Sequence, residues 1–352
     1  MRKTVRIVLH LAVFAVSALF LIQVLRKAGI DNIREALGRC NWWYLPPAFL
    51  ATTGRFLSWN LKWQILNRAF FPIRFFRLFP ILMAGTFTNT VVPGTRAGGG
   101  LVRAYFLSRS SGQPFPLCYG GVLLDGAFNM AAFVLLTLCA LPFVASSTSL
   151  LTPTTSVPTG LLALTVVLFV GLLALIHRRK RKETGIAPLI TFLHHLLPAG
   201  SRRKRFPTAH ELQGWLHERF REFLEAFRSL TNRRGTLWIS FLLALMVYGF
   251  LFLCNDLLFR SFDRPIGILP IVAGVTLSSV LGTFFMTPGG IGVADAALVG
   301  VYLAFGVEAD LAVAVTILYR GLLYAHTLVG GLPCLIFLQW KYGRVRKEDI
   351  KE

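Results

Sequence analysis

The sequence predicts an all-α, polytopic integral membrane protein of about eight transmembrane helices, two of whose segments are Pro/Gly-broken or re-entrant. Of 352 residues, 55% are hydrophobic and 15% are charged, against roughly 25% charged in an ordinary soluble domain. The apolar residues form uncharged blocks close to the about 20 residues that a helix needs to cross a bilayer. Lys and Arg lie between these blocks. We therefore expect a single transmembrane domain over residues 1–352.

The uncharged blocks lack the polar stripe that a soluble core helix shows every three to four residues. They are Ile7–Leu25, Gly160–Ile176, Leu237–Asn255, Ile266–Met286 and Gly321–Leu338, the last interrupted by His326. The first block follows three basic residues, as a signal peptide does. It is longer than the usual apolar region of such a peptide and no clear small-residue cleavage site follows, so an uncleaved helix is favoured.

The basic residues predict the topology, because cytoplasmic loops are enriched in Lys and Arg. Residues 177–235 are strongly basic and should be cytoplasmic, whereas residues 145–159 carry no charge and should be external. Basic residues at both ends of the chain place the N- and C-termini in the cytoplasm, which suits a multi-pass protein of the cell inner membrane. Residues 26–39 resist this scheme, because they should be external yet carry four cations.

The same charge distribution predicts a re-entrant hairpin. If Leu78–Val92 crossed the membrane fully, Leu117–Phe143 would run inward and the uncharged loop after it would be cytoplasmic. The conflict disappears if Phe79–Leu107 enters and leaves on one face, broken at residues 93–100. Non-helical backbone at membrane depth is tolerated only where protein buries it or where it lines a cavity.

The cytoplasmic loop contains an amphipathic helix over residues 208–230. Thr208 and Glu211 form a capping-box pattern, and apolar residues then recur at helical spacing with basic residues opposite. This helix either packs under the transmembrane bundle or lies in the headgroup region. The preceding basic run, residues 202–205, would favour an anionic leaflet.

A second Pro/Gly break, Thr287–Asp295, resembles the first and leads into a short apolar helix, Ala296–Phe305. Paired interruptions in two halves of a membrane chain point to a transporter binding site, since half-helix ends can hold an ion or an anionic group at depth. The alternative is that Gly and Pro are simply common in membrane helices. Because both breaks open with a Pro-Gly pair, Pro93-Gly94 and Pro288-Gly289, a binding site is favoured.

Ionisable residues inside apolar segments are the other functional signal, because each costs about 2.5–3.5 kcal/mol at the bilayer centre. Those present are Arg55, Lys62, Arg96, Arg103, Asp125, Asp295 and Arg320. Asn129 lies one helical turn after Asp125, on the same face. The cations could bind a phosphate, or Asp125 and Asp295 could form a structural ion-pair network with Arg103 and Arg320. Lys62 could alternatively extend to the interface.

Several function classes are disfavoured. The positive-inside rule already explains the net charge of +21, so no nucleic acid is expected as a partner. The five cysteines form no C-x-x-C pair, His194 and His195 are adjacent and cannot share a helix face, and His210 and His217 lie on a basic surface helix. No metal or other cofactor is therefore expected. Hydrolase, metalloprotease and prenyl- or sugar-transfer motifs are absent. The longest segment between apolar blocks is too short and too basic for a catalytic domain, so we do not expect an enzyme.

Residues at the two breaks carry a family resemblance. Asn89, Pro93, Arg96 and Gly98 with Arg103, then the run Pro288 to Val293, and Tyr319-Arg320 in the last block occur in a fairly specific order and spacing. In these residues the chain resembles the flippase-like membrane domain of lysylphosphatidylglycerol synthases, which also occurs as stand-alone membrane proteins of bacteria and archaea. The resemblance covers nearly the whole chain.

The chain departs from that family at three places. Gly100 replaces a frequent acidic residue, Asp125-Gly126 with Asn129 stands where Glu-Arg and a later Asp are common, and Asp295 replaces a common Glu. The resemblance implies that the protein moves a lipid or lipid-linked headgroup between leaflets. The soluble aminoacyl-transferase half of the synthases is absent, which argues against lysyl transfer.

These observations predict a transporter for an anionic phospholipid or lipid-linked intermediate. The predicted substrate-binding residues are Arg96, Arg103, Asp125, Asn129, Asp295 and Arg320. The residues predicted to form the backbone of the two broken segments, which would shape the cavity, are Asn89, Pro93, Gly94, Gly98, Pro288, Gly289, Gly290 and Gly292. The main alternative is a non-catalytic scaffold that binds a lipid-modifying or glycosyl-transferring membrane enzyme through the basic loop. An intramembrane transferase is the least favoured alternative.

Overall fold

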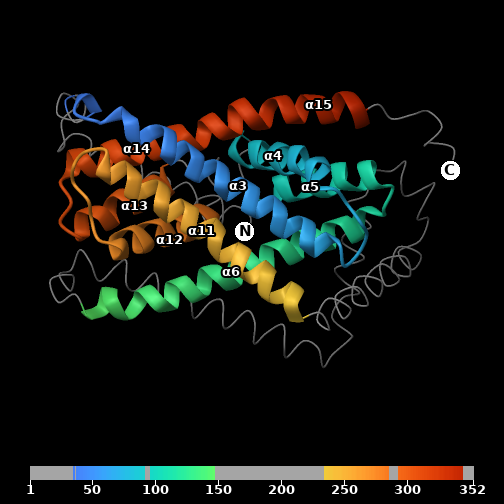
Figure 1. Ribbon diagram of the computed structural model, residues 1–352, viewed down its shortest axis with the longest axis horizontal. Helices are drawn as coiled ribbons and strands as arrows, with labels where there is room; N and C mark the ends of the chain where they lie inside the picture. Colours follow the sequence, from blue (N-terminus) through green and yellow to red (C-terminus); the bar gives the residue numbers. More distant parts are fainter. Residues whose placement is uncertain (1–34, 36, 92–95, 147–233, 285–291, 344–352) are drawn as a thin grey trace, which may run out of the picture.

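The long axis of the molecule is set by helices that run nearly its full length (Figure 1). The computed structural model describes residues 35, 37–91, 96–146, 234–284 and 292–343, and all regular structure within these ranges is helical. The long elements are α3 (Leu45–Asn67), which follows the short turn η1 (Trp42–Tyr44), then α6 (Phe115–Ser146), α11 (Arg234–Arg260) and a composite of α14 (Ala309–Ala325), the π-helical η5 (His326–Gly331) and α15 (Leu332–Tyr342). The predicted all-α class is confirmed. The described residues do not test the predicted number of about eight spans.

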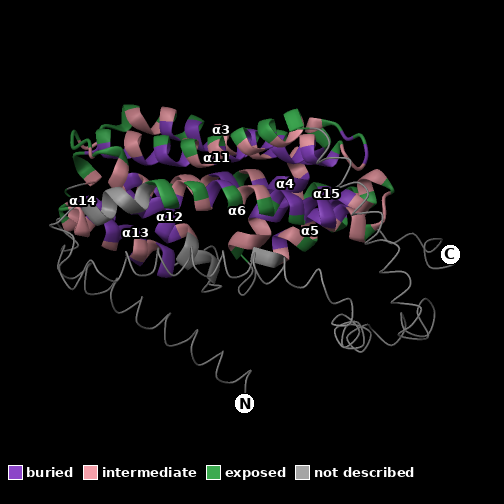
Figure 2. Ribbon diagram, turned by 90° about the horizontal axis from the view of Figure 1, so that it is seen from below, coloured by how far each residue is buried: buried purple, intermediate pink, exposed green. Residues whose placement is uncertain are grey.

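Three of these elements are long and apolar enough to cross a bilayer, namely Phe115–Cys139, Arg234–Arg260 and Ala309–Tyr342. Exposed and buried residues alternate around the helices, with the buried ones facing the interior (Figure 2). Exposed tryptophans lie near helix ends: Trp42 and Trp43 before α3, Trp238 at the start of α11 and Trp340 at the end of α15. Tryptophan at both ends of an apolar bundle is typical of the membrane–water interfaces.

Helices α3 and α11 pack antiparallel along their length. The Cys40 thiol lies 3.4 Å from the Ser261 hydroxyl near one end of the pair, and the Thr52 hydroxyl lies 3.5 Å from the Cys254 sulfur nearer the middle. A Cβ on Gly54 would lie 2.7 Å from the Phe250 ring. Small residues therefore allow the close approach of these two helices.

Helices α4 (Phe75–Val91) and α5 (Arg96–Ser111) form a hairpin. The 17 residues of α4 span only about 25 Å at 1.5 Å per residue, and the chain then reverses. The Gly99 amide donates to Asn89 Oδ1 at 2.8 Å and ties the two arms together near the tip. Both outer ends of the hairpin lie at the same end of the molecule (Figure 1), as the charge distribution predicted.

A second hairpin consists of α12 (Ile268–Phe284) and α13 (Val293–Ala304). Within the predicted block Ile266–Met286, α12 pairs with α13 and its described part is a shorter apolar helix. Gly274 makes the pairing possible, since a Cβ there would lie 3.0 Å from the Leu298 side chain and 3.1 Å from the Tyr302 ring. The short apolar helix predicted at Ala296–Phe305 corresponds to α13.

The two hairpins enter from opposite ends of the molecule, and their tips point towards its middle (Figure 1). Each half of the described chain thus has the same order of elements: a long helix, a two-helix hairpin and another long helix. The second half runs in the opposite direction to the first. Such inverted repeats are common in membrane transporters, whose binding sites lie near the bilayer midplane between the repeats.

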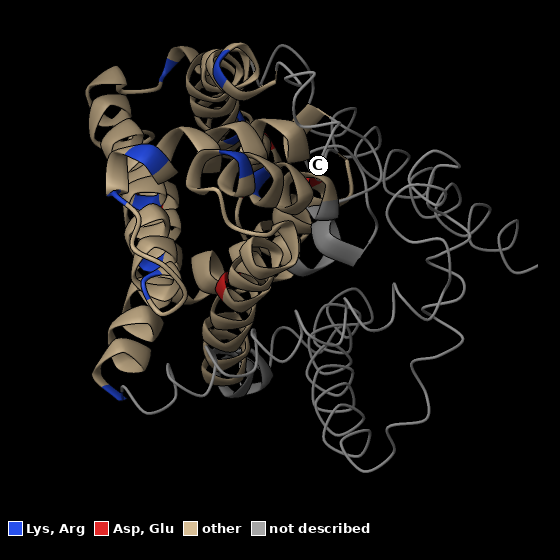
Figure 3. Ribbon diagram, turned by 90° about the vertical axis from the view of Figure 1, so that its right-hand side faces the viewer, with Lys and Arg blue, Asp and Glu red and all other residues tan. Residues whose placement is uncertain are grey.

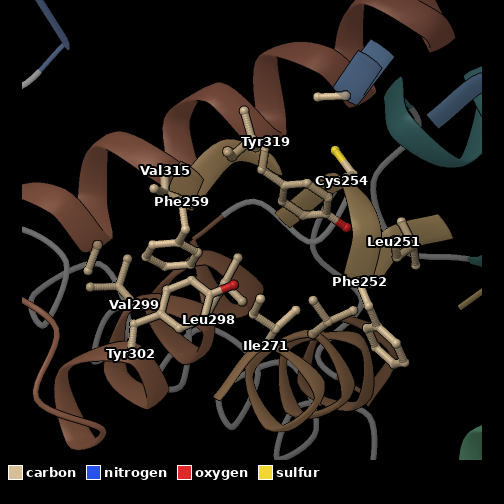
Figure 4. Close-up of a cluster of buried hydrophobic side chains, with 14 of the residues drawn as sticks. Leu251, Phe252, Cys254, Phe259, Ile271, Leu298, Val299, Tyr302, Val315 and Tyr319 are labelled. Atoms are coloured by element: carbon tan, nitrogen blue, oxygen red, sulfur yellow. The ribbon is translucent and has the colours of Figure 1, made fainter. Parts of the chain in front are cut away.

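The core around the second hairpin is a cluster contributed by α3 and α11 to α14 (Figure 4). Tyr302 is fully buried there, its ring packs edge-on against Phe259 at 4.9 Å, and its hydroxyl donates to Asn255 Oδ1 at 3.0 Å. A separate cluster with Trp63 at its centre packs the first hairpin against α3 and α15. The two hairpins are therefore held by separate cores.

Charged residues distinguish the two ends of the molecule. The described charged residues at the open end of the first hairpin are all basic, and Figure 3 views this end: Arg68, Arg74, Arg77, Arg109, Arg234 and Lys341. The other end carries both signs: Glu35, Arg39, Asp256, Arg260, Asp263, Arg264, Glu308 and Asp310.

Some predictions need a boundary correction or lie elsewhere. The last span begins at Ala309 rather than Gly321, because α14, η5 and α15 are continuous. The blocks Ile7–Leu25 and Gly160–Ile176, the amphipathic helix at residues 208–230 and most of the basic loop lie outside the described residues.

Candidate functional site

Three charged side chains from three helices meet in the interior beside the first hairpin. Lys62 of α3, Arg103 of α5 and Asp125 of α6 have side-chain exposures of 0%, 7% and 1%. Lys62 Nζ lies 2.9 Å from Asp125 Oδ1, and Arg103 Nη2 lies 2.9 Å from Asp125 Oδ2. One carboxylate therefore neutralises two cations, and this charged trio has a net charge of +1.

Polar and aromatic side chains complete the surroundings of the trio. The Trp59 indole N–H donates to Asp125 Oδ2 at 2.8 Å, and Lys62 Nζ donates to the side-chain oxygen of Asn129 and, at 3.1 Å, to the Asp125 carbonyl oxygen. The guanidinium of Arg103 lies over the Trp63 ring at 3.9 Å. Cation–π contact is strongest where water is excluded, so the tryptophans hold Arg103 in place.

Glycines on the first hairpin make room for the Arg103 side chain. A Cβ on Gly85 would lie 2.5 Å from Arg103 Cγ and 2.8 Å from the Gly99 carbonyl oxygen. Any larger residue at position 85 would therefore push Arg103 away from Asp125. The Gly-rich stretch at the start of α5 lets the two arms approach and lets the arginine pass between them.

A second ion pair lies at the start of α13. Asp295 pairs with Arg320 of α14, and its other carboxylate oxygen accepts a hydrogen bond from the Gly292 amide at 3.0 Å. Gly292 has a φ of +84°, a conformation that L-residues with side chains rarely adopt. Asp295 thus caps the helix that follows the second break and orients Arg320.

The two ion pairs occupy equivalent places in the two halves. In each half, a residue on the second arm of the hairpin pairs with a residue on the following long helix: Arg103 with Asp125, and Asp295 with Arg320. The signs are exchanged between the halves. Both hairpins are thereby tied to the long helix behind them by charge as well as by packing.

Arg55 of α3 is a further cation in the interior, which the sequence analysis noted but did not count among the binding residues. Its guanidinium lies 5.1 Å from the centre of the Phe56 ring and 5.9 Å from that of Trp59. Among the described residues, no acidic side chain forms an ion pair with it, and its Nε is buried without a hydrogen-bond partner. The Nε of Arg103 is also buried without a hydrogen-bond partner. The Arg103 guanidinium lies 5.4 Å from the centre of the Trp59 ring, which Arg55 also approaches.

The structure brings together most of the predicted site residues that it describes. Arg103, Asp125 and Asn129 lie in one cluster, and Asp295 and Arg320 form the second. The suggestion that Lys62 extends to the interface was wrong, because its amine is fully buried between Asp125 and Asn129. Helix α5 begins at Arg96, whose side chain lies outside the described set, as do Pro93, Gly94, Pro288, Gly289 and Gly290.

Comparisons with known proteins place the chain in a membrane-protein family. The sequence profile of the lysylphosphatidylglycerol synthase TM region matches residues 7–331. A UPF0104 membrane protein of Methanocaldococcus jannaschii is 24% identical over 331 residues, covering 91% of this chain and 93% of the relative. A UPF0104 membrane protein of Pyrococcus horikoshii is 25% identical over 316 residues, covering 88% and 91%. With nearly its whole length matched, the chain belongs to the lysylphosphatidylglycerol synthase TM-region family.

Proposed function

We propose that this protein moves an anionic phospholipid or lipid-linked intermediate between the leaflets of the cell inner membrane. The observation that supports this most directly is the pair of buried Nε–H donors on Arg55 and Arg103, whose guanidinium groups lie 5.9 Å and 5.4 Å from the centre of the Trp59 ring. A buried donor without an acceptor costs about 1–3 kcal/mol. A phosphate oxygen is the acceptor that suits a guanidinium best.

The charge balance of the interior supports an anionic ligand. The charged residues of the two ion-pair clusters and Arg55 are four cations and two carboxylates, which leaves a net charge of +2: Arg55, Lys62, Arg103 and Arg320 against Asp125 and Asp295. In a region of low dielectric, excess charge of one sign favours a ligand of the other. A headgroup phosphate would bring the missing negative charge.

The two carboxylates have a role in this proposal. In the unloaded protein Asp125 and Asp295 hold Arg103 and Arg320, and a phosphate competes with them for the guanidinium N–H groups. Each guanidinium has five N–H donors, so an arginine can keep its aspartate while it binds the ligand. Arg96, at the start of α5, is included in the proposal from the sequence alone.

The orientation of the protein follows from its charged ends. We infer that the basic end, with Arg77, Arg109 and Lys341, faces the cytoplasm, because basic residues are retained on that side. The first hairpin would then open to the cytoplasm and the second to the outside. The ligand would enter between the hairpins from either leaflet, and its headgroup would reach the cations between the tips.

A reconstitution experiment tests the proposal. Liposomes with and without the purified protein would carry a trace of nitrobenzoxadiazole-labelled phosphatidylglycerol, and dithionite would quench the dye in the outer leaflet only. The proposal predicts that the protein raises the quenchable fraction above one half for this anionic lipid. Labelled phosphatidylcholine is the neutral-headgroup comparison. Equal behaviour of protein-containing and empty liposomes with every anionic lipid tried would overturn the proposal.

A further inference from the structure

A buried histidine lies at the point where the last long helix changes its hydrogen-bond pattern. His326 begins the π-helical turn η5 and is 8% exposed. Its ring stacks on Phe49 at 4.1 Å and approaches Phe56 at 5.7 Å. Single π-turns within α-helices occur frequently at functional sites, and none of the roles assigned above uses this residue.

The hydrogen bonds around His326 form a chain. Nδ1 lies 2.8 Å from the Leu322 carbonyl oxygen, which only accepts, so Nδ1 carries a proton. Nε2 lies 2.9 Å from the Thr53 hydroxyl, and that hydroxyl lies 3.0 Å from the Phe49 carbonyl oxygen. The chain therefore runs from α14 through the imidazole to two successive groups on α3.

This chain is complete only when the imidazole carries both protons. The Thr53 hydroxyl has one hydrogen to donate. When the ring is neutral, this hydrogen goes either to Nε2 or to the Phe49 carbonyl oxygen, and the other acceptor receives no hydrogen bond from Thr53. With an imidazolium, Nε2–H donates to Thr53 and Thr53 donates to Phe49, and every donor has an acceptor. Thr53 therefore makes both of its hydrogen bonds at once only with the protonated ring.

The Arg55 guanidinium and the His326 ring border the same aromatic side chain. They lie 5.1 Å and 5.7 Å from the centre of the Phe56 ring, so Arg55 repels a positive imidazole. Helix α4 presents Met83 and Phe87 to the glycines of the same π-turn. The other titratable groups on neighbouring elements include Tyr248 and Cys254 of α11, Tyr319 and Tyr324 of α14, Cys334 of α15 and the Asp295–Arg320 pair.

We propose that His326 binds a proton when an anionic headgroup binds beside Arg55, so that lipid binding and proton uptake are coupled. An anion at Arg55 cancels the repulsion between the guanidinium and a protonated ring, and the hydrogen-bond chain then favours the imidazolium. Linkage is reciprocal, so a lower pH must tighten binding of the anion. This inference rests on the proposed function, and it adds the proton as a second ligand.

The test uses the detergent-solubilised full chain and dihexanoyl phosphatidylglycerol below its micellar concentration. Isothermal titration calorimetry in two buffers of different ionisation enthalpy gives the number of protons taken up per lipid bound. Near pH 6.5, where histidine ordinarily titrates, we expect uptake of a fraction of a proton by the wild type. The affinity should rise by up to tenfold per unit of pH decrease across the range in which the ring is neutral without the lipid and protonated with it.

Variants separate this inference from the proposed function. His326→Gln should bind the lipid with no proton uptake and with an affinity independent of pH. Thr53→Val removes the acceptor of the imidazolium and should reduce the uptake, whereas Thr53→Ser keeps the hydroxyl and should retain it. Lipid binding by the wild type without proton uptake, or undiminished uptake by His326→Gln, would overturn the coupling alone. Absence of binding by the wild type would overturn the proposed function and the coupling with it.

Discussion

Gly99 faces Gly85 across the first hairpin so closely that a Cβ on Gly99 would lie 2.2 Å from the Gly85 carbonyl oxygen. The same Cβ would lie 2.4 Å from Asn89 Oδ1, the acceptor of the Gly99 amide. These contacts are with backbone and with a hydrogen-bonded side chain, so neither can move without separating the arms. The hairpin therefore depends on the absence of a side chain at this position.

Gly99→Ala should separate α4 from α5 and lower the stability by about 1–3 kcal/mol, the usual cost of forcing extra atoms into a packed interior. The matched control is its neighbour Gly100→Ala, whose Cβ would meet only Val122 at 3.4 Å. Thermal unfolding of the two variants in detergent, followed by circular dichroism, compares them. Equal midpoints for both variants would contradict the close packing of the arms.

Arg103→Lys should reduce lipid translocation about tenfold or more although the charge is kept, because an ammonium lacks the planar fork of a guanidinium. The effect is measured as the rate at which labelled phosphatidylglycerol in liposomes becomes accessible to dithionite. Arg260→Lys is the control, because Arg260 forms a surface pair with Asp256 at 2.7 Å and is half-exposed. A normal rate for a folded Arg103→Lys variant would remove Arg103 from the proposed site.

The charged trio predicts opposite consequences for its members. Arg103→Leu leaves the neutral pair Lys62–Asp125, whose amine and carboxylate lie 2.9 Å apart, and should fold. Asp125→Leu leaves two buried cations without a counter-charge and should cost about 3–5 kcal/mol. The yield of monodisperse protein after extraction and its unfolding midpoint distinguish them. Comparable losses for both would mean that Asp125 does not neutralise the two cations together.

Arg55→Gln should abolish or strongly reduce translocation while leaving the protein as stable as the wild type or more stable. The reason is that the Arg55 Nε is buried without an acceptor and no described acidic side chain pairs with the guanidinium. Stability and transport would be measured on the same preparation. A large loss of stability together with normal transport would show that Arg55 is structural.

The topology can be tested with single cysteines in a cysteine-free variant and an impermeant thiol reagent on intact cells. Cysteines replacing Arg77 and Arg109 should both be protected, because these positions lie at the basic end of the molecule. Cysteines replacing Asp263 and Glu308, at the other end, should be labelled. Labelling of only one of positions 77 and 109 would exclude the hairpin, and labelling of both with protection of 263 and 308 would reverse the orientation. Within the loops, residues 145–159 should be labelled and residues 177–235 protected.

The sequence was most informative where electrostatics constrains the chain. The first hairpin was predicted because a full crossing by Leu78–Val92 would have placed the uncharged loop in the cytoplasm. The pairing of Asp125 and Asp295 with Arg103 and Arg320 was one of the two alternatives weighed, since isolated charges in apolar segments need partners. The helical spacing of Asp125 and Asn129 likewise predicted a shared face, which Lys62 contacts.

The remaining features depend on contacts between distant segments. The burial of Lys62 could not be predicted, because α3 carries it near its last turn, where a lysine could also have reached the interface. The second hairpin gave no charge conflict, and an apolar segment such as Ile266–Met286 has the composition of a crossing span. The partnership of Thr53 with His326 joins positions 273 residues apart and leaves no pattern in the sequence.

The dependence of α3 on Asp125 has a consequence for biosynthesis. Helix α3 contains Arg55 and Lys62 and is not among the helices apolar enough to cross a membrane by themselves. Each cation costs about 2.5–3.5 kcal/mol at the centre of an isolated inserting helix, and the carboxylate that balances Lys62 emerges from the ribosome only 63 residues later. We therefore expect α3 to remain at the insertion machinery until α6 has been synthesised, so that the two helices enter the lipid together. Substitution of Asp125 would then impair the insertion of α3 into the membrane, before the protein has folded.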